Sequence, residues 1–247
     1  MKAYKTMLKT EIKLSLRDMN MPIFAIIMPF IVLVVLGVIY GSKPAFDGAG
    51  CTFLEQSLGA VATIAICAGG VMGLPLVISD YRSKHILKRF KVTPVSPAII
   101  LLVQVTIYVL YAFASLVIVS ATAMLLFGAR IHGSVVQFLL GWLLVMVSMF
   151  SIGMMVGGIA KNSKIAGIIA SALYFPMLIF SGGTLPYEVM PAAMQKAVDI
   201  LPLTQGIKIL KAATLGQPLD NVLLPIIVMA AITVVCSLIA FKFFKWE

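Results

Sequence analysis

PIFAIIMPFIVLVVLGVIY, residues 22 to 40, contains no charged side chain. A helix rises about 1.5 Å per residue, so a run of about 20 apolar residues crosses the hydrocarbon core of a bilayer. Open strands cannot cross lipid, because their backbone polar groups would stay unpaired. The sequence therefore predicts an all-α integral membrane protein with six transmembrane helices. The six predicted spans are 22–40, 56–79, 98–127, 134–160, 164–182 and 221–241.

The composition supports a protein that consists of membrane-spanning segments. Of 247 residues, 61% are hydrophobic and 11% are charged, whereas soluble domains are roughly one-half apolar and one-quarter charged. No segment between the runs is long enough for a separate soluble domain, so we expect residues 1–247 to form a single transmembrane domain. The three cysteines have no C-x-x-C spacing and the two histidines fall in different loops, so we predict no metal site.

The basic residues indicate which ends of the spans face the cytoplasm. If the N-terminus is cytoplasmic, 14 of the 19 Lys and Arg residues lie on that side. The positive-inside rule therefore predicts that both termini are cytoplasmic. These residues are Lys2, Lys5, Lys9, Lys13, Arg17, Arg82, Lys84, Lys88, Arg89, Lys91, Lys161, Lys164, Lys242 and Lys245.

The N-terminal segment 1–20 has the pattern of an interfacial amphipathic helix. Its lysines and Arg17 share one side of a helical projection, and apolar residues share the other. Such a helix lies in the cytoplasmic interface of a membrane. Glu11 and Asp18 interrupt the apolar side, which indicates that part of this face contacts protein. The alternative is a frayed basic tail.

The loop SDYRSKHILKRFKVTPVSP, residues 79–97, holds the densest cluster of charge in the chain. Ile86, Leu87, Phe90 and Val92 have spacings that give a short helix one apolar face, and prolines follow. A cytoplasmic helix with apolar and basic residues can insert into a cleft on another protein, and we expect one at residues 81–93. The alternative is a solvated loop that follows the charge bias.

FSGGTLP, residues 180–186, has the serine-glycine-glycine tract of an ATP-binding cassette ATPase signature. The predicted topology puts it on the outer side, and the chain has no G-x-x-x-x-G-K-[ST] phosphate loop. We therefore expect Gly182 and Gly183 to end the fifth span and Pro186 to turn the chain. Residues 184–216 are too apolar for a free loop and predict short re-entrant outer helices, either a gate or a purely structural hairpin.

Two stretches resemble one known family. F-K-V-T-P-V-S-P at 90–97, after L-K-R at 87–89, resembles the cytoplasmic loop of permeases from the type-2 family of ATP-binding cassette (ABC) exporters. FSGGTLPYEVMPAAMQKAVDILPLTQGIKILKAATLG, residues 180–216, is similar to that family's segment between spans five and six. The chain departs from the family pattern at Tyr81, Ser83 and His85, where acid, acid and glycine are usual.

The resemblance implies a permease subunit in the cytoplasmic membrane of a prokaryote. Two cytoplasmic ABC ATPase subunits would bind ATP and Mg, so this chain would not itself be an enzyme. A second permease copy or a paralogue would complete a homo- or heterodimer, surrounded by membrane lipid and without nucleic acid. The expected ATPase-coupling surface is Leu87, Lys88, Arg89 and Phe90, and the expected outer gate is Gly182, Gly183 and Pro186.

The family's pathway runs between subunits along spans two and five, which makes Thr63, Ser171, Tyr174 and Phe175 candidates for lining it. Small residues on these faces serve helix packing as an alternative, and we interpret G-x-x-x-G at 37–41 and at 153–157 as packing. No span centre carries a convincing charged residue, which disfavours ion-coupled transport and suits apolar or amphipathic cargo.

The function expected from the sequence is therefore the permease of an ATP-driven exporter of drug, antibiotic, peptide or lipid-like compounds. The alternatives are polysaccharide or lipid-linked glycan export, and a non-ABC transporter or channel. A channel would show rings of charge or a filter motif, and neither occurs. A membrane-embedded enzyme would require clustered catalytic residues that the sequence does not show.

Overall fold

The computed structural model of the protein describes residues 2–17, 20–41, 43–45, 50–84, 86, 97–181, 190–218 and 222–243. Within these ranges every regular element is a helix, and six helices are long and apolar enough to cross a membrane. The predicted all-α class with six transmembrane helices is therefore confirmed. The six helices run over Ile23–Tyr40, Phe53–Ser83, Ala98–Phe127, Val135–Ile159, Ser163–Phe180 and Leu223–Phe243.

Two of the six helices contain a π-helical segment. The first consists of η1 (Ile23–Ile27) and α3 (Met28–Tyr40), after the short α2 (Asn20–Pro22). The second consists of α4 (Phe53–Cys67), η2 (Ala68–Gly73) and α5 (Leu74–Ser83). The other four are α7 (Pro97–Phe127), α8 (Val135–Ile159), α9 (Ser163–Phe180) and α12 (Leu223–Phe243). Single π-helical turns are often found at functional sites, so η1 and η2 mark positions of interest.

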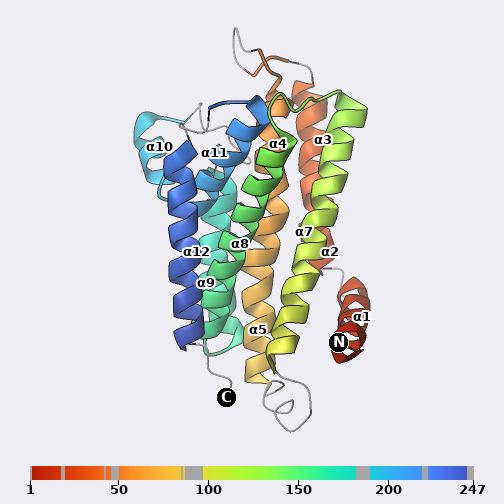
Figure 1. Ribbon diagram of the computed structural model, residues 1–247, viewed down its shortest axis with the longest axis vertical. Helices are drawn as coiled ribbons and strands as arrows, with labels where there is room; N and C mark the ends of the chain where they lie inside the picture. Colours follow the sequence, from red (N-terminus) through yellow and green to blue (C-terminus); the bar gives the residue numbers. More distant parts are fainter. Residues whose placement is uncertain are drawn as a thin grey trace.

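The three shorter helices lie at opposite ends of the bundle. In Figure 1, α1 (Lys2–Arg17) lies at the lower end, where α12 also ends. The helices α10 (Ala192–Val198) and α11 (Pro202–Leu215) lie at the upper end. We use lower end and upper end in this sense below. The two ends of the described chain are thus on the same side of the bundle.

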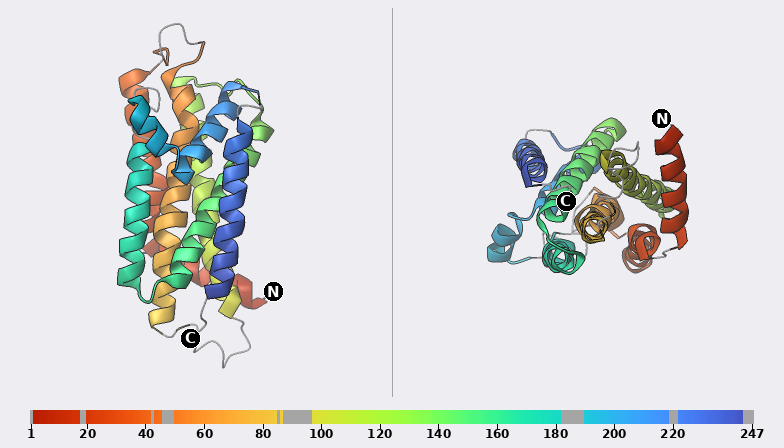
Figure 2. Two further views of the ribbon diagram at one scale, coloured as in Figure 1. Left: turned by 90° about the vertical axis from the view of Figure 1, so that its left-hand side faces the viewer. Right: turned by 90° about the horizontal axis from the view of Figure 1, so that it is seen from below.

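The helix formed by α4, η2 and α5 occupies the centre of the bundle. Seen from below in Figure 2, it lies among α3, α7, α8 and α9, and α12 lies beyond α8. Of its most apolar 18-residue window, 83% is buried, compared with 22% for the first, fifth and sixth spanning helices. Alanines, glycines and β-branched residues fill α4 and η2. Because small side chains let helix backbones approach closely, this segment can be enclosed on all sides.

Helix α8 packs against the central helix through glycines. A Cβ on Gly153 would overlap the carbonyl oxygen of Gly70, and one on Gly157 would lie 3.0 Å from the Cβ of Ile78. Gly70 in turn faces Phe150 and Met149 of α8. The G-x-x-x-G pattern at 153–157 therefore serves helix packing, as we expected from the sequence. In the pattern at 37–41, Gly37 packs against the ring of Phe127, but Gly41 follows the end of α3 with a φ of +46° and does not pack against another helix.

At the upper end, α11 is buried among the spanning helices α4, α8 and α12. A Cβ on Gly59 of α4 would lie 2.8 Å from the Cβ of Leu210 in α11, so this contact also depends on the absence of a side chain. Helix α11 ends at Leu215, and Gly216 follows with a φ of +69°, a left-handed conformation that glycine adopts without strain. Helix α11 thus fills the space between α4, α8 and α12 at the upper end of the bundle.

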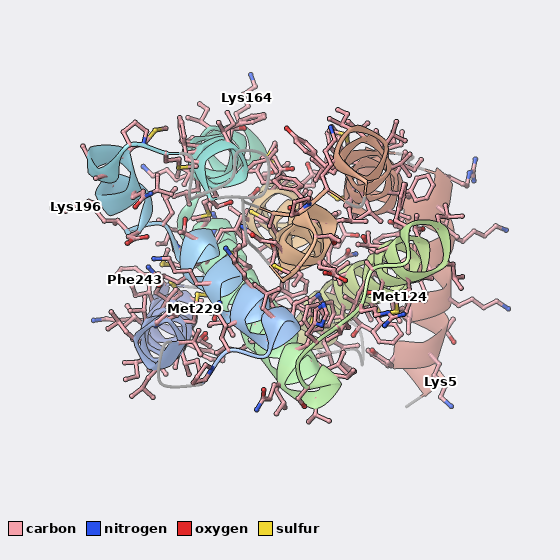
Figure 3. All side chains as sticks on the ribbon, turned by 90° about the horizontal axis from the view of Figure 1, so that it is seen from above. Lys5, Met124, Lys164, Lys196, Met229 and Phe243 are labelled. Atoms are coloured by element: carbon pink, nitrogen blue, oxygen red, sulfur yellow. The ribbon has the colours of Figure 1, made fainter. Side chains whose placement is uncertain are left out.

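Lysine side chains project outward at the edge of the bundle. Figure 3, seen from above, shows Lys5 on α1, Lys164 on α9 and Lys196 on α10 at the periphery. Met229 of α12 lies among the helices and has no exposed surface. The outer faces of α3, α9 and α12 carry many exposed large apolar side chains, as expected for surfaces that face lipid or another subunit.

Candidate functional site

Two of the three predicted sites lie outside the described residues. The coupling surface Leu87, Lys88, Arg89 and Phe90 and the outer gate Gly182, Gly183 and Pro186 both fall in such segments. The flanking helices are described: α5 ends at Ser83 and α7 begins at Pro97, both at the lower end, and α9 ends at Phe180 at the upper end. These two sites stay predictions.

The pathway candidate Thr63 lies in the middle of α4 with no exposed surface. Its Oγ1 donates a hydrogen bond to the carbonyl oxygen of Ala60 at 2.7 Å. A buried hydroxyl needs such a partner, because leaving it unpaired is costly. Thr63 is therefore a satisfied polar position inside the most enclosed helix of the bundle.

The three candidates on α9 divide between two faces. Ser171 Oγ lies 3.9 Å from Met72 Sδ, so Ser171 faces η2. Tyr174 is buried near Cys67 of α4 and meets the ring of Phe175 edge-on at a centroid distance of 5.4 Å. Phe175 is half-exposed on the outer side of α9. The structure thus brings Ser171 and Tyr174 against the helix that carries Thr63, and it leaves Phe175 at the surface.

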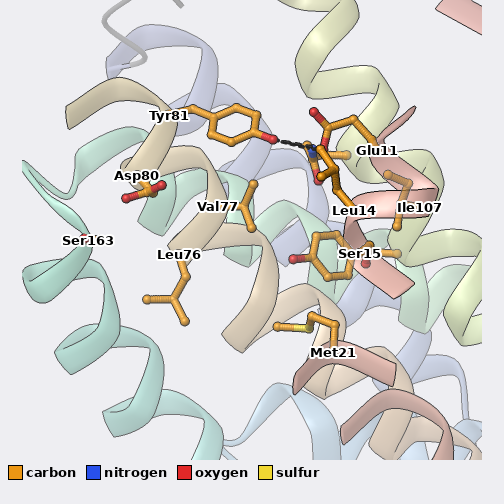
Figure 4. A pocket seen from close by; sticks show the side chains of 12 residues that line it. Glu11, Leu14, Ser15, Met21, Leu76, Val77, Asp80, Tyr81, Ile107 and Ser163 are labelled. Carbon is orange, nitrogen blue, oxygen red and sulfur yellow. Dashed lines mark hydrogen bonds between the residues drawn. The ribbon is translucent and has the colours of Figure 1, made fainter. Parts of the chain in front are cut away.

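A cavity of about 410 Å³ lies at the lower end between α1, α5, α7 and α9. Its polar lining includes Glu11, Asp80, Tyr81 and Gln104, and apolar side chains such as Ile107 complete it. Figure 4 shows Glu11 and Tyr81 on one side of this cavity, joined by a hydrogen bond. This volume is within the usual range of ligand pockets, about 300 to 1,000 Å³. Its lining residue Tyr81 is also the first residue of the predicted coupling segment 81–93.

Among the described residues, Glu55 is the one buried charged side chain, and it lies near the upper end of α4. The other buried polar residues are the neutral Thr63, Ser79, Gln104, Ser115, Ser148, Ser151, Ser181, Thr204, Gln205 and Thr214. A fixed charge in hydrocarbon is costly and usually marks an ion or proton relay. The described core of the bundle is therefore apolar with scattered hydroxyl and amide groups.

Sequence reasoning missed two polar clusters. Glu55 closes a capping box with Thr52 and also binds the backbone N–H of Arg130 and the ring of His132. The T-x-x-E spacing that begins at Thr52 is a known helix-start pattern and could have identified half of this cluster. At the lower end, Gln104 of α7 contacts Glu11 and Tyr81, and no local pattern points to a glutamine inside an apolar run.

The fold and these features define a polytopic membrane protein. A central helix packs against four of the other spanning helices, one helix lies beside the lower end, and a pair of short helices lies at the upper end. The family model of the ABC-2 type transporter matches residues 2–215. The chain therefore belongs to the ABC-2 type transporter family, and the resemblance stated from its sequence is confirmed.

Three relatives show a similar local match. Nodulation protein J of Rhizobium leguminosarum bv. viciae is 33% identical over 90 residues, which cover 36% of this chain and 35% of that protein. Inner membrane transport permease YhhJ of Escherichia coli (strain K12) is 32% identical over 85 residues, 34% of this chain and 23% of that protein. Nodulation protein J of Neorhizobium galegae is 30% identical over 74 residues, which cover 30% of this chain and 28% of that protein. The matched stretches span about a third or less of these relatives.

Proposed function

We propose that this chain is the permease subunit of an ATP-driven exporter that moves hydrophobic or amphipathic compounds outward across the cytoplasmic membrane of a prokaryote. Family membership supports a transport role, and the lack of buried charge in the middle of the described bundle supports an apolar or amphipathic cargo. Because Glu55 is the one buried charge among the described residues and lies near the upper end, the described helices present no buried fixed charge at mid-membrane depth to a cargo with an apolar body.

The proposed complex has two cytoplasmic ATPase subunits, which bind ATP and Mg, and two permease subunits. Both termini face the cytoplasm, so the lower end meets the ATPases. Leu87, Lys88, Arg89 and Phe90 form the contact, and ATP-driven closure of the ATPases pushes the segment 81–93. Any such coupling requires contacts that differ between two states of the complex. Thr63, Ser171, Tyr174 and Phe175 line the path, and Gly182, Gly183 and Pro186 gate its outer end.

The first test is purification of the full chain in mild detergent from its native host. Co-purification of a cytoplasmic ATPase, with ATP hydrolysis lost when that subunit is removed, supports the proposal. A stable complex that contains no ATPase contradicts it.

The second test replaces one residue of the coupling surface. Phe90→Asp puts a charge into the proposed apolar contact and should abolish ATP-driven export while the chain remains folded in the membrane. Phe90→Leu is the matched control, because it keeps an apolar side chain. Export is followed in inside-out vesicles with the compound to which a deletion strain becomes most sensitive. Normal export by the aspartate variant overturns the coupling assignment.

A further inference from the structure

Three polar contacts attach the N-terminal helix α1 to the lower end of the bundle. Tyr4 Oη lies 2.8 Å from Thr106 Oγ1, and Ser15 Oγ lies 2.8 Å from Tyr111 Oη. Between them, Glu11 Oε2 accepts a hydrogen bond from Gln104 Nε2 at 2.9 Å. Residues 4, 11 and 15 are separated by seven and four positions, which places them on one face of a helix. This face of α1 follows α7, and its lysines lie elsewhere on the helix.

Glu11 differs from the other two contacts because it also reaches α5. Its Oε2 accepts a second hydrogen bond, from Tyr81 Oη at 3.0 Å, and Gln104 Nε2 donates to Tyr81 Oη at 3.0 Å. The three side chains form a closed triangle from α1, α5 and α7, and Figure 4 shows the Tyr81–Glu11 side of it. Gln104 is 5% exposed, so its amide depends on these partners.

The triangle includes the first residue of the predicted coupling segment and a residue of the helix that follows it. Tyr81 is the first residue of segment 81–93, in the last turn of α5, and Gln104 lies two turns into α7. The segment connects α5 to α7 along the chain, so a force applied to it is transmitted to the two helices that Glu11 joins to α1. Hydrogen bonds to an ionised carboxylate are roughly twice as strong as neutral ones, which makes this the firmest of the three attachments.

We propose that Glu11 is a positioning residue that holds α1 to both helices flanking the coupling segment, so that α1, α5 and the start of α7 move as one unit. This inference rests on the proposed function, in which an ATPase moves that segment. The removal of Glu11 leaves the Tyr81–Gln104 hydrogen bond in place, so α1 loses its hydrogen bond to α5 and keeps only its Tyr4 and Ser15 contacts with α7, while α5 and α7 stay joined.

The structural measurement is a spin-label distance in the full chain, with its three native cysteines replaced by alanine. Lys13→Cys on α1 and Ser83→Cys on α5 are both exposed and suit labelling. We expect one narrow distance distribution that does not change between the nucleotide-free complex and the complex with ATP and vanadate. In Glu11→Ala we expect a distribution at least about twofold broader that shifts with nucleotide, while ATP hydrolysis stays within about twofold. Glu11→Gln keeps an acceptor oxygen and should recover most of the narrow distribution.

Ser15→Ala is the matched control, because Ser15 lines the same cavity and attaches α1 to α7 alone. Its distribution should stay narrow and independent of nucleotide. An unchanged distribution in Glu11→Ala overturns the inference. The inference is also overturned if Ser15→Ala broadens the distribution equally. It is overturned as well if the broadened distribution of Glu11→Ala does not change with nucleotide. If no ATPase co-purifies with the unmodified chain, the proposed function fails. The distance distribution without nucleotide then tests the positioning role by itself. Broadening in Glu11→Ala supports that role, and no broadening overturns it.

Discussion

Gly153 of α8 lies directly against the carbonyl oxygen of Gly70, at the point where α8 crosses the π-helical segment η2. Backbone touches backbone here, so no flexible side chain can move aside. We predict that Gly153→Ala destabilises the protein by about 1 to 3 kcal/mol, the usual cost of overpacking. The thermal unfolding midpoint in detergent measures this loss.

Gly167→Ala in α9 is the control for that prediction. Its Cβ would lie 3.4 Å from Leu76 Cδ2, an ordinary van der Waals distance. Because alanine is favoured over glycine in helices by up to about 1 kcal/mol, this variant should keep or slightly raise the unfolding midpoint. Equal midpoints for the two variants would contradict the packing argument.

Glu55 connects the start of α4 to the loop between α7 and α8 at the upper end. Its Oε2 accepts from the backbone N–H of Thr52 at 2.8 Å, its Oε1 accepts from the backbone N–H of Arg130 at 2.9 Å, and His132 Nε2 lies 3.2 Å away. We predict that Glu55→Ala costs about 3 kcal/mol of stability, because it leaves the part-buried backbone N–H groups of Thr52 and Arg130 unpaired. His132→Ala should cost at most about 1 kcal/mol, since partly exposed side-chain contacts of this kind contribute little. A His132 variant as unstable as Glu55→Ala would show that the His132 contact, and not the backbone capping, holds this end.

Ser148 joins α8 to α12 by hydrogen bonds inside the bundle. Its Oγ contacts the carbonyl oxygen of Met229 at 3.1 Å and Thr233 Oγ1 at 2.7 Å. Hydrogen bonds between membrane helices contribute about 0.6 kcal/mol on average, with a maximum near 1.7. We therefore predict that Ser148→Ala lowers stability by less than Gly153→Ala does, despite the loss of two contacts. Unfolding in a denaturing detergent ranks the two variants, and the reverse order would refute this comparison.

The fold class could be predicted because the bilayer leaves few choices. An apolar run such as residues 22–40 must be helical in lipid, whatever its neighbours are. The packing role of Gly153 and Gly157 was also predictable, since small residues four positions apart meet a neighbouring helix. These features depend on local composition, which a single sequence displays directly.

The polar clusters could not be predicted in the same way, because they depend on residues far apart in the chain. Gln104 meets Glu11 across 93 positions, and Arg130 meets Glu55 across 75. The acidic Glu11 on the apolar face of the N-terminal helix indicated a contact with protein, but the sequence did not show that Gln104 and Tyr81 are its partners. On α9, the helical period separates Tyr174 from Phe175, yet only the packed structure shows that Tyr174 is the one turned inward.

Phe175 lies on the exposed side of α9, in an apolar stripe with Ile168 and Ile179. The proposed pathway runs between two permease copies, so this exposed stripe of span five should face the second copy. We predict that Phe175→Cys, with the native cysteines replaced, forms a disulfide-linked dimer in membranes under mild oxidation. Leu238→Cys on α12 is the control, because Leu238 is also well exposed but lies on a different helix. Gel electrophoresis without reductant distinguishes the two, and cross-linking at Leu238 with none at Phe175 would place the interface on α12 and remove Phe175 from the pathway.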